Sequence, residues 1–162
     1  MAKESLHYIL GNAMPTYAKN KKARFDYEIL ETLEAGLVLT GQEVKSIRDG
    51  QAKLTGAFVT FHKGEPVLTN AHISKYKHAG PLDSYEPTHS RKLLLNKKEI
   101  DYLRGKSEEK GLTIVPLSLY TRGSHIKVEI GIGRGKKKYD KRRVIKERES
   151  KREDIRQIKE NM

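Results

Sequence analysis

The sequence predicts a mainly β protein, an OB-like small antiparallel barrel with two or three short helices and a C-terminal basic tail. Short segments that alternate apolar with polar residues, or that are rich in β-branched and aromatic side chains, recur between turn-forming glycines. The helical patterns between them are short. Positive charge is concentrated in the last 29 residues, which contain too few apolar side chains to form a core. Closure of the strands into a barrel would remove exposed sheet edges.

The length and composition support one domain plus an extension. A chain of 162 residues with 36% hydrophobic residues can build a modest core if the basic tail is excluded from it. We expect a weakly ordered N-terminal leader over residues 1–18, the barrel over residues 19–133 and the tail over residues 134–162. The leader has no sustained periodicity and contains Gly11 and Pro15.

The first strand is predicted from residue 25. Phe25, Tyr27 and Ile29 alternate with acidic residues, which is the period of a half-buried strand. The Ala-Gly pair at 35–36 would break or bulge this strand before the apolar run at 37–39. A basic cluster lies just before it and consists of Lys19, Lys21, Lys22 and Arg24.

A short helix and a hairpin follow. Residues 41–50 place two apolar residues three apart and end with Gly50, which suits the position after a helix C-cap. Residues 55–61 and 67–73 are rich in β-branched and aromatic side chains and are separated by a glycine-containing turn. We therefore expect these two segments to pair as a hairpin.

A second helix is predicted after the apolar run at residues 93–95. Asn96 is a suitable N-cap, and Glu99 three residues later makes the start of the helix close to a capping box. Ile100 and Leu103 would form the buried face of this helix.

A second hairpin is predicted from residues 112–120 and 126–132, which flank a polar turn. Both segments alternate apolar and polar residues. Pro116 lies inside the first segment, and because proline cannot donate to a sheet ladder, it indicates an edge or a bulge there.

The sequence shows no catalytic or metal-binding pattern. It contains no cysteine, and its six histidines lack close metal-ligand spacings: His7, His62, His72, His78, His89 and His125. The carboxylates considered for nuclease chemistry show no diagnostic spacing and are interpreted as solvated acids or salt-bridge partners: Glu34, Glu43, Asp49 and Asp83. The glycines before Lys136 match neither a phosphate-binding loop nor a dinucleotide fingerprint. We expect no enzyme activity, catalytic residue, metal, cofactor or small-molecule substrate.

The hydropathy pattern argues against a membrane protein. No run approaches the roughly 20 apolar residues of a spanning helix. The tail lacks a continuous apolar face, since its aliphatic residues leave a gap between Ile145 and Ile155. Absence of cysteine is compatible with a reducing compartment. We expect a soluble, cytoplasmic protein with no membrane partner.

The charge distribution indicates RNA as the partner. Residues 134–162 contain 13 Lys/Arg against 6 Asp/Glu, so that +7 of the formal net charge of +12 lies in the tail. Basic side chains that neutralise phosphates release condensed counterions, which makes such a concentration typical of nucleic-acid binding.

Five segments are shared, in order and spacing, with one known family. They are NKKAR with Tyr27 (residues 20–27), EAGLVLTGQEVKSIRDG (34–50), RKLLLNKKEI (91–100), GLTIVPLSLY (111–120) and KVEIGIGRGKKKYDKR (127–142). They cover nearly the whole chain from residue 20 to the tail, and EVKSIR, RKLLLN and GKKKYDKR are each unusual. On these residues the chain resembles the SsrA-binding protein (small protein B, tmRNA-binding) family.

The resemblance implies a non-enzymatic RNA-binding protein required for trans-translation. Its OB-like barrel would bind the tRNA-like domain of tmRNA near the elbow and deliver it to the A site of stalled ribosomes. Its tail would occupy the decoding centre and the empty mRNA channel of the small subunit. We expect a monomer. Two other functions fit the charge and remain open: a generic OB-fold RNA chaperone or ribosome-associated RNA-binding protein, and an RNA-processing enzyme whose carboxylates converge only in the fold.

The resemblance also implies which barrel residues face the RNA. Glu34, Leu94 and Asn96 match family residues at the interface, and a carboxylate there can accept from base amino or ribose hydroxyl groups. Basic and aromatic residues complete the predicted set: Lys21, Lys22, Arg24, Tyr27, Lys45 and Arg91. From the residues alone, Glu34 could be an ordinary strand-end acid, Leu94 a core residue and Asn96 merely the helix cap.

The predicted ribosome-facing residues lie at the start of the tail. They are Gly135, Lys136, Lys137, Tyr139, Asp140, Lys141, Arg142, Ile145 and Lys146. Tyr139 stands where family members can carry histidine, and its ring can stack on an rRNA base. The rest of the tail has favourable and repulsive charge pairs at i,i+4, so we expect it to be disordered in the free protein and helical on the ribosome. Residues 131–135 would form a pivot between barrel and tail.

Overall fold

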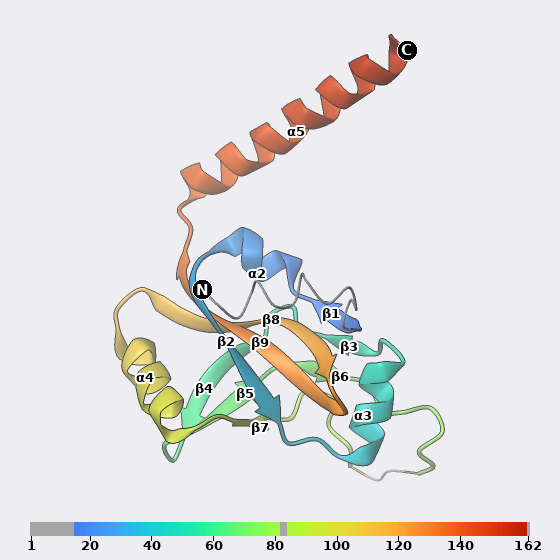
Figure 1. Cartoon of the computed structure of the whole chain (residues 1–162), viewed down its shortest axis with the longest axis vertical. Coiled ribbons are helices and arrows are strands. Elements are labelled where there is room, and N and C mark those ends of the chain that lie inside the picture. Colours follow the sequence, from blue (N-terminus) through green and yellow to red (C-terminus); the bar gives the residue numbers. More distant parts are fainter. Residues whose placement is uncertain (1–14, 82–83, 162) are drawn as a thin grey trace.

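The structure is a mainly β body from which one long helix extends (Figure 1). This computed structural model describes residues 15–81 and 84–161. An antiparallel seven-stranded sheet has the order β1-β8-β9-β2-β7-β5-β4, and β3 pairs with β6 beside it. The strands are β1 (Thr16–Lys19), β2 (Tyr27–Leu37), β3 (Ala52–Lys53), β4 (Phe58–His62), β5 (Glu65–Thr69), β6 (His72–Ile73), β7 (Arg91–Leu94), β8 (Leu112–Arg122) and β9 (His125–Gly135). In the described residues the helices are α2 (Lys21–Asp26), α3 (Gly41–Arg48), α4 (Lys97–Glu108) and α5 (Lys138–Glu160).

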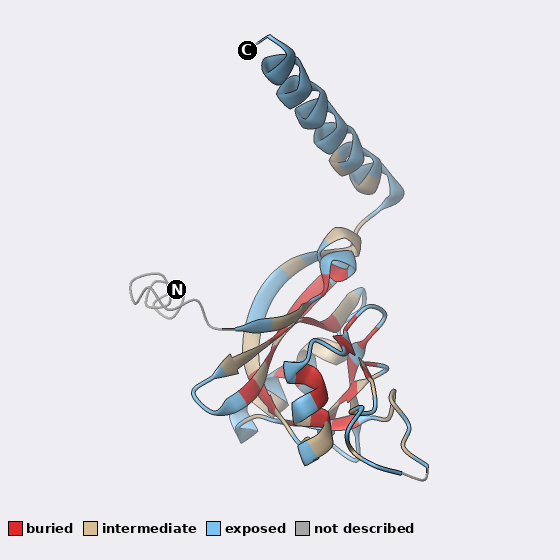
Figure 2. Ribbon diagram, turned by 90° about the vertical axis from the view of Figure 1, so that its right-hand side faces the viewer, coloured by how far each residue is buried: buried red, intermediate tan, exposed pale blue. Residues whose placement is uncertain are grey.

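The core lies inside the curled sheet. The sheet bends until its end strand β4 packs against β8, while α4 packs against β5 and β8 and α3 packs against β6. Ile47 of α3 and Leu103 of α4 are fully buried against the inward residues of the strands, which Figure 2 shows as the red interior. The mainly β prediction is confirmed, whereas the finer OB-like description stays a prediction.

Most elements predicted from local patterns are present. Both hairpins form, and the helix after Thr40 ends before Gly50, which has a φ of +74°. Asn96 and Glu99 form a capping box at the start of α4. The pairing of β8 with β9 shifts register between Pro116 and Ser118, and β8 lies between β1 and β9, which agrees with the bulge rather than the edge as the alternative at the proline.

The segment around Arg24 differs from its prediction. Residues 21–26 form a helix, so residues 25–26, predicted as the start of a strand, are helical, and β2 begins only at Tyr27. Asn20 caps this helix through its Oδ1, and its Nδ2 donates to the carbonyl oxygens of Leu54 (3.1 Å) and Pro116 (2.9 Å). The capping bond is local, since Oδ1 accepts from the backbone N–H of Ala23, but the alternation of Phe25, Tyr27 and Ile29 favoured a strand there. The carbonyls that anchor Nδ2 are distant in sequence, so no local pattern indicated them.

The N-terminal leader also differs where the structure describes it. Residues 16–18, expected to be weakly ordered, belong to β1, which pairs with β8. The hydroxyl of Tyr17 accepts a hydrogen bond from Thr121 at 2.8 Å. Residues 1–14 lie outside the described residues.

The pivot predicted over residues 131–135 is wrong, because this stretch continues β9. A Cβ on Gly131 would lie 2.9 Å from Cδ1 of Leu117, and one on Gly133 would lie 2.9 Å from Cβ of Tyr27. The two glycines therefore permit close packing of Tyr27, Leu117 and their neighbours on the outer face of the sheet. Ala23 of α2 covers this small cluster.

The tail is a helix of 23 residues, α5, none of which is buried (Figures 1 and 2). Its base contacts α2: the backbone N–H of Lys136 donates to the carbonyl of Asp26 at 2.9 Å, and Lys141 pairs with the Asp26 carboxylate at 3.2 Å. The disorder predicted for the free tail is not confirmed. Strong helix formers fill the segment, and an i,i+4 pair between Arg143 and Glu147 (3.5 Å) supports the helix.

Within the part of the chain that the structure describes, no helix has the length and apolarity needed to span a bilayer.

Candidate nucleic-acid interface

Three residues of the basic cluster, Lys21, Lys22 and Arg24, lie on α2 at one end of the outer face of the sheet, whereas Lys19 ends β1. The side chains of Lys22 and Arg24 are 63% and 55% exposed although both have acidic partners, Asp26 at 2.7 Å and Glu129 at 3.5 Å. Lys21 is also exposed. Because Asn20 anchors the start of the helix to two buried carbonyls, these cations project from a fixed support.

Glu34 lies near the middle of this outer face, opposite Glu129 in the β2–β9 ladder. Its carboxylate accepts a hydrogen bond from the Tyr120 hydroxyl and two from Arg122, at 2.9 and 3.1 Å. The side chain is 30% exposed. Each carboxylate oxygen has two acceptor positions, so Glu34 can still accept from an external donor.

The protonation of this group follows from its contacts. Burial alone would raise the pKa of Glu34, but the hydrogen bonds from Tyr120 and Arg122 more than offset it and hold the pKa below its ordinary value. Burial and the hydrogen bond to Glu34 raise the pKa of Tyr120. Glu34 is therefore an anion at neutral pH and Tyr120 a neutral donor.

Leu94 is on the surface, so the interpretation of this residue as part of the core is wrong. It is 52% exposed on β7 and lies opposite Gly36 of β2. A shallow groove of about 180 Å³ beside it is lined by Gly36, Leu37, Leu39, Val44, Leu94 and residues 124–127. An exposed leucine at a groove offers an apolar contact for a base or ribose.

Asn96 is the helix cap that the local pattern predicted. Its Oδ1 accepts from the backbone N–H of Glu99 at 2.9 Å, and Glu99 accepts from the N–H of Asn96 at 3.1 Å. Asn96 is exposed. The cap does not exclude RNA contact, since the side-chain amide also carries two N–H donors.

These three residues come together at one region of the surface. Glu34 and Gly36 are two apart on β2 and share a face, and Leu94 lies opposite Gly36. Asn96 follows two residues after Leu94. On the other side, Glu129 connects Glu34 to Arg24 of α2. The structure thus forms one outer strip from α2 to the start of α4.

The strip includes residues that the sequence did not identify. Tyr120 and Arg122 hold Glu34, while Ser118 donates to Glu129 at 3.0 Å. Their alternation along the predicted strand could have placed them on the outward face. Their position beside Glu34 depends on the β2–β9–β8 register, which no local pattern gives.

The prediction that Arg91 faces RNA is wrong, because its side chain is 0% exposed. The guanidinium donates to the carbonyl oxygens of Ala71 (2.8 Å), Pro87 (2.9 Å) and His89 (3.1 Å), and its Nε lies 3.4 Å from Oε2 of Glu43. Arg91 occupies an inward position of β7 and orders the loop before that strand.

Glu43 belongs to the same buried cluster as Arg91 and contacts Arg91 and His89. Its Oε1 lies 2.6 Å from Nε2 of His89, and Arg91 contacts both carboxylate oxygens, each at 3.4 Å. Burial would raise the pKa of Glu43, but the hydrogen bond with His89 and the charge of Arg91 hold it below its ordinary value. The carboxylate therefore faces the interior and not a substrate.

The other predicted residues are distributed over the molecule. Lys45 on α3 is exposed, with its Nζ 5.7 Å from the ring centroid of Tyr76. Tyr27 packs in the outer cluster with Ile29. The tail residues gather at the base of α5, where Tyr139 is 75% exposed, Ile145 is 44% exposed, and Lys136 and Lys141 contact α2. Gly135 is exposed at the end of β9, and Lys137, Asp140, Arg142 and Lys146 are exposed around the first turns.

Among the residues with described positions, no group of three or more His, Cys, Asp or Glu side chains could hold a metal ion. His7 and Asp83 lie outside these residues.

Known proteins are similar to this chain in sequence and in fold. A model of the family described as "SmpB protein" matches residues 17–160. SsrA-binding proteins from Roseiflexus castenholzii and Thermosynechococcus vestitus are 53% identical over 143 residues (88% of this chain, 90% of the relative) and 48% identical over 151 residues (93% and 99%). A solved structure described as "tmRNA-SmpB: a journey to the center of the bacterial ribosome" is 49% identical, covers 74% of this chain and 84% of its own, and has a TM-score of 0.63. With this agreement over nearly its whole length, the chain belongs to the SmpB, or SsrA-binding, protein family.

Proposed function

We propose that this protein binds the tRNA-like domain of tmRNA and delivers it to the A site of stalled ribosomes in trans-translation. The observation that carries the proposal is α5, a strongly charged helix of 23 residues that buries none of them. Helices in globular proteins gain most of their stability from packing an apolar face, which α5 does not do on this body. Apart from the contacts of α5 with α2, a partner outside the chain would supply the packing that this helix lacks.

The body supplies a separate RNA-binding device. The cations of α2 suit phosphates, while the Glu34 carboxylate, the exposed Leu94 and the Asn96 amide suit base edges and ribose. These groups lie on one strip, supported by ladders and a capping box rather than by loops. Such rigid support favours a structured RNA over a flexible strand.

The tail is proposed to lie in the decoding centre and the empty mRNA channel. Among the exposed large hydrophobic side chains of the described residues, Tyr139 has the highest exposure, and it stands at the start of α5, where it can stack on an rRNA base. The basic side chains around it suit the phosphates of rRNA. The helix would be stabilised there, because phosphates neutralise like charges along it.

Truncation after Gly135 tests whether the body binds tmRNA while the tail acts on the ribosome. The shortened protein should bind tmRNA with nearly the affinity of the full chain, because the strip on the body is intact, but should not support peptide tagging on stalled ribosomes. Binding is measured by RNA titration and tagging in a reconstituted translation system. A chain ending at Glu160 serves as the control and should retain both activities. Loss of both activities on truncation after Gly135 would contradict the proposal.

The generic RNA chaperone is the alternative that a binding experiment separates. A tRNA-like RNA with an intact elbow and an unstructured RNA of equal length are compared at several salt concentrations. The proposal predicts tighter binding to the structured RNA at every concentration, whereas equal affinities would favour the chaperone.

We also propose that the protein is a monomer that acts in the cytoplasm without catalysing a reaction. The buried ion pair of Glu43 supports the last point, because it removes one of the carboxylates that a metal-dependent nuclease would need. RNA cleavage that disappears in Glu43→Gln or Asp49→Asn would contradict it.

A further inference from the structure

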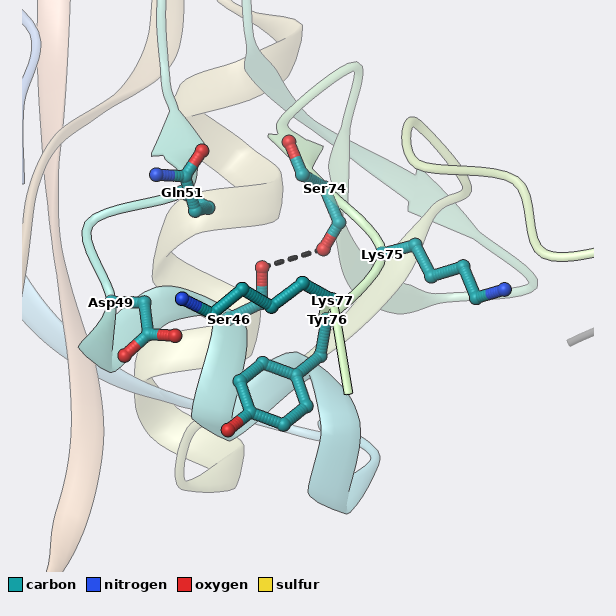
Figure 3. A pocket seen from close by; sticks show the side chains of 7 residues that line it. All are labelled: Ser46, Asp49, Gln51, Ser74, Lys75, Tyr76 and Lys77. Atoms are coloured by element: carbon teal, nitrogen blue, oxygen red, sulfur yellow. Dashed lines mark hydrogen bonds between the residues drawn. The ribbon is translucent and has the colours of Figure 1, made fainter. Parts of the chain in front are cut away.

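A second, larger pocket lies at the C-terminal end of α3, away from the outer strip. It has a volume of about 550 Å³ and is lined by Ser46, Asp49, Gln51, Ser74, Lys75, Tyr76 and Lys77 (Figure 3). The groove at Leu94 contacts α3 earlier along the helix, at Val44. The pocket is therefore a separate feature on the same helix, and its size is in the range of small-molecule sites.

The walls of this pocket are fixed by hydrogen bonds. Ser46 donates to the carbonyl of Ser74 at 2.5 Å, as Figure 3 shows, and the N–H of Ser74 donates to the carbonyl of Gln51 at 3.0 Å. The N–H of Tyr76 donates to Oε1 of Gln42 on α3 at 2.9 Å. The loop that carries Tyr76 is thus held against the helix, and a ligand would bind with little ordering of the walls.

The lining combines an aromatic ring, cations and hydrogen-bonding groups. The Nζ of Lys45 lies 5.7 Å from the ring centroid of Tyr76, and the ring of His78 approaches it edge-on at 5.4 Å. In Figure 3 the side chain of Lys77 extends toward Asp49, whereas Lys75 points away from it. A simple anion would not require the ring, and an apolar ligand would not require the cations. A nucleotide uses both.

We propose that this pocket binds one unpaired nucleotide of an RNA partner. The base stacks on Tyr76, its edge or ribose bonds to Asp49 and Gln51, and the adjoining phosphates lie near Lys77 and Lys45. The nucleotide must be unpaired, since a base within a duplex cannot reach an aromatic ring. The inference rests on the proposed function for the presence of an RNA partner and adds a contact outside the strip. The tRNA-like RNA and ribosomal RNA offer the same chemistry, and the experiment distinguishes them.

Substitution of Tyr76 tests the stacking contact in the full-length protein. Binding is measured in one arm to the isolated tRNA-like RNA and in the other to ribosomes. Tyr76→Leu should weaken binding roughly 5- to 150-fold in the arm that supplies the nucleotide, while Tyr76→Phe, which retains the ring, should stay close to wild type. Wild-type affinity of Tyr76→Leu in both arms would overturn the inference.

Substitution of Lys77 tests the phosphate contact and does not depend on the packing of Tyr76. Lys77→Gln should reduce the dependence of log affinity on log salt by about one unit in the same arm. Lys110→Gln, at an exposed lysine of the α4–β8 turn, is the matched control and should keep the wild-type slope. Equal slopes for the two variants would overturn the phosphate contact.

The two proposals fail in different ways. If wild-type protein binds neither RNA, the proposed function fails and the pocket assignment falls with it. If wild-type protein binds and supports tagging while the Tyr76 and Lys77 variants match it in both arms, only the pocket assignment fails. Thermal unfolding of each variant identifies any loss of RNA affinity that is due to instability. If Tyr76→Leu is unstable, the result for Lys77→Gln alone decides whether the pocket assignment holds.

Discussion

At the scale of single residues, the outward side chains of β2 and β8 have structural contacts as well as candidate RNA contacts. Glu34 is the clearest case, because Tyr120 and Arg122 both donate to it. Its charge therefore contributes to the stability of the sheet, and this contribution can be measured without RNA.

Glu34→Gln should lower the free energy of unfolding by about 1–2 kcal/mol at neutral pH, because two donors lose a charged acceptor. The pKa of Glu34 in the folded protein lies below the ordinary value of 4.5. The stabilisation is thus present above pH 4.5 and is lost as the pH falls through the folded-state pKa. Urea titrations should show that the free energies of unfolding of wild type and Glu34→Gln converge at low pH. The control is Glu28→Gln, at an exposed position of the same strand. A difference in unfolding free energy that does not depend on pH would contradict this account.

Arg91 gives a larger effect, because its guanidinium compensates the buried Glu43. Arg91→Ala should lower the free energy of unfolding by roughly 3–5 kcal/mol, the usual effect of leaving a buried charge unpaired. The neighbouring Lys92 is the matched control, since its pair with Glu65 is on the surface and Lys92→Ala should change stability by about 0–1 kcal/mol. Chemical denaturation compares the two. Near wild-type stability combined with lost RNA binding in Arg91→Ala would restore the original assignment of this residue.

At the scale of elements, the sequence predicts what is local. The helix α3, the start of α4 and both hairpins follow from periodicity, capping and turn residues within a few positions. The helix α2 was missed because the alternation of Phe25, Tyr27 and Ile29 favoured a strand over the local cap at Asn20, and the carbonyls of Leu54 and Pro116 that anchor this cap are distant in sequence. The same holds for Gly131, whose missing side chain leaves room for Leu117 of the adjacent strand.

Asn96 has two candidate roles, as the cap of α4 and as an RNA contact, and two substitutions of this residue separate them. Asn96→Ala removes the cap and should lower stability by about 1 kcal/mol. Asn96→Asp keeps a capping oxygen, so stability should stay near wild type, while the new negative charge opposes RNA phosphates and weakens binding to the tRNA-like RNA. Asn161→Asp at the end of α5 adds the same charge away from the strip and is the control. Wild-type affinity of Asn96→Asp would limit this residue to capping.

At the scale of the whole molecule, the candidate site could be predicted only in part. The sequence identified Glu34, Leu94 and Asn96 through the resemblance, but their meeting on one strip depends on β2 pairing with both β7 and β9. The resemblance also placed Arg91 among the RNA-facing residues, whereas its inward position on β7 and its contact with Glu43 leave its side chain 0% exposed. Both the sequence and the structure divide the basic charge between α2 and α5. The structure also shows that the two helices meet at Asp26, which pairs with Lys22 of α2 and with Lys141 of α5.

This separation predicts two different salt dependences. Truncation after Gly135 removes 12 of the 33 Lys/Arg residues and leaves the strip and α2 intact. Each phosphate contact contributes about 0.7–0.9 to the slope of log affinity against log salt. The slope for the isolated tRNA-like RNA should therefore hardly change, whereas the slope for ribosomes should fall by several units. Titrations at four or more salt concentrations, with the chain ending at Glu160 as control, measure both slopes. An equal fall in both would mean that α5 also contacts the tRNA-like RNA, and unchanged slopes would mean that its charges contact no ribosomal phosphates.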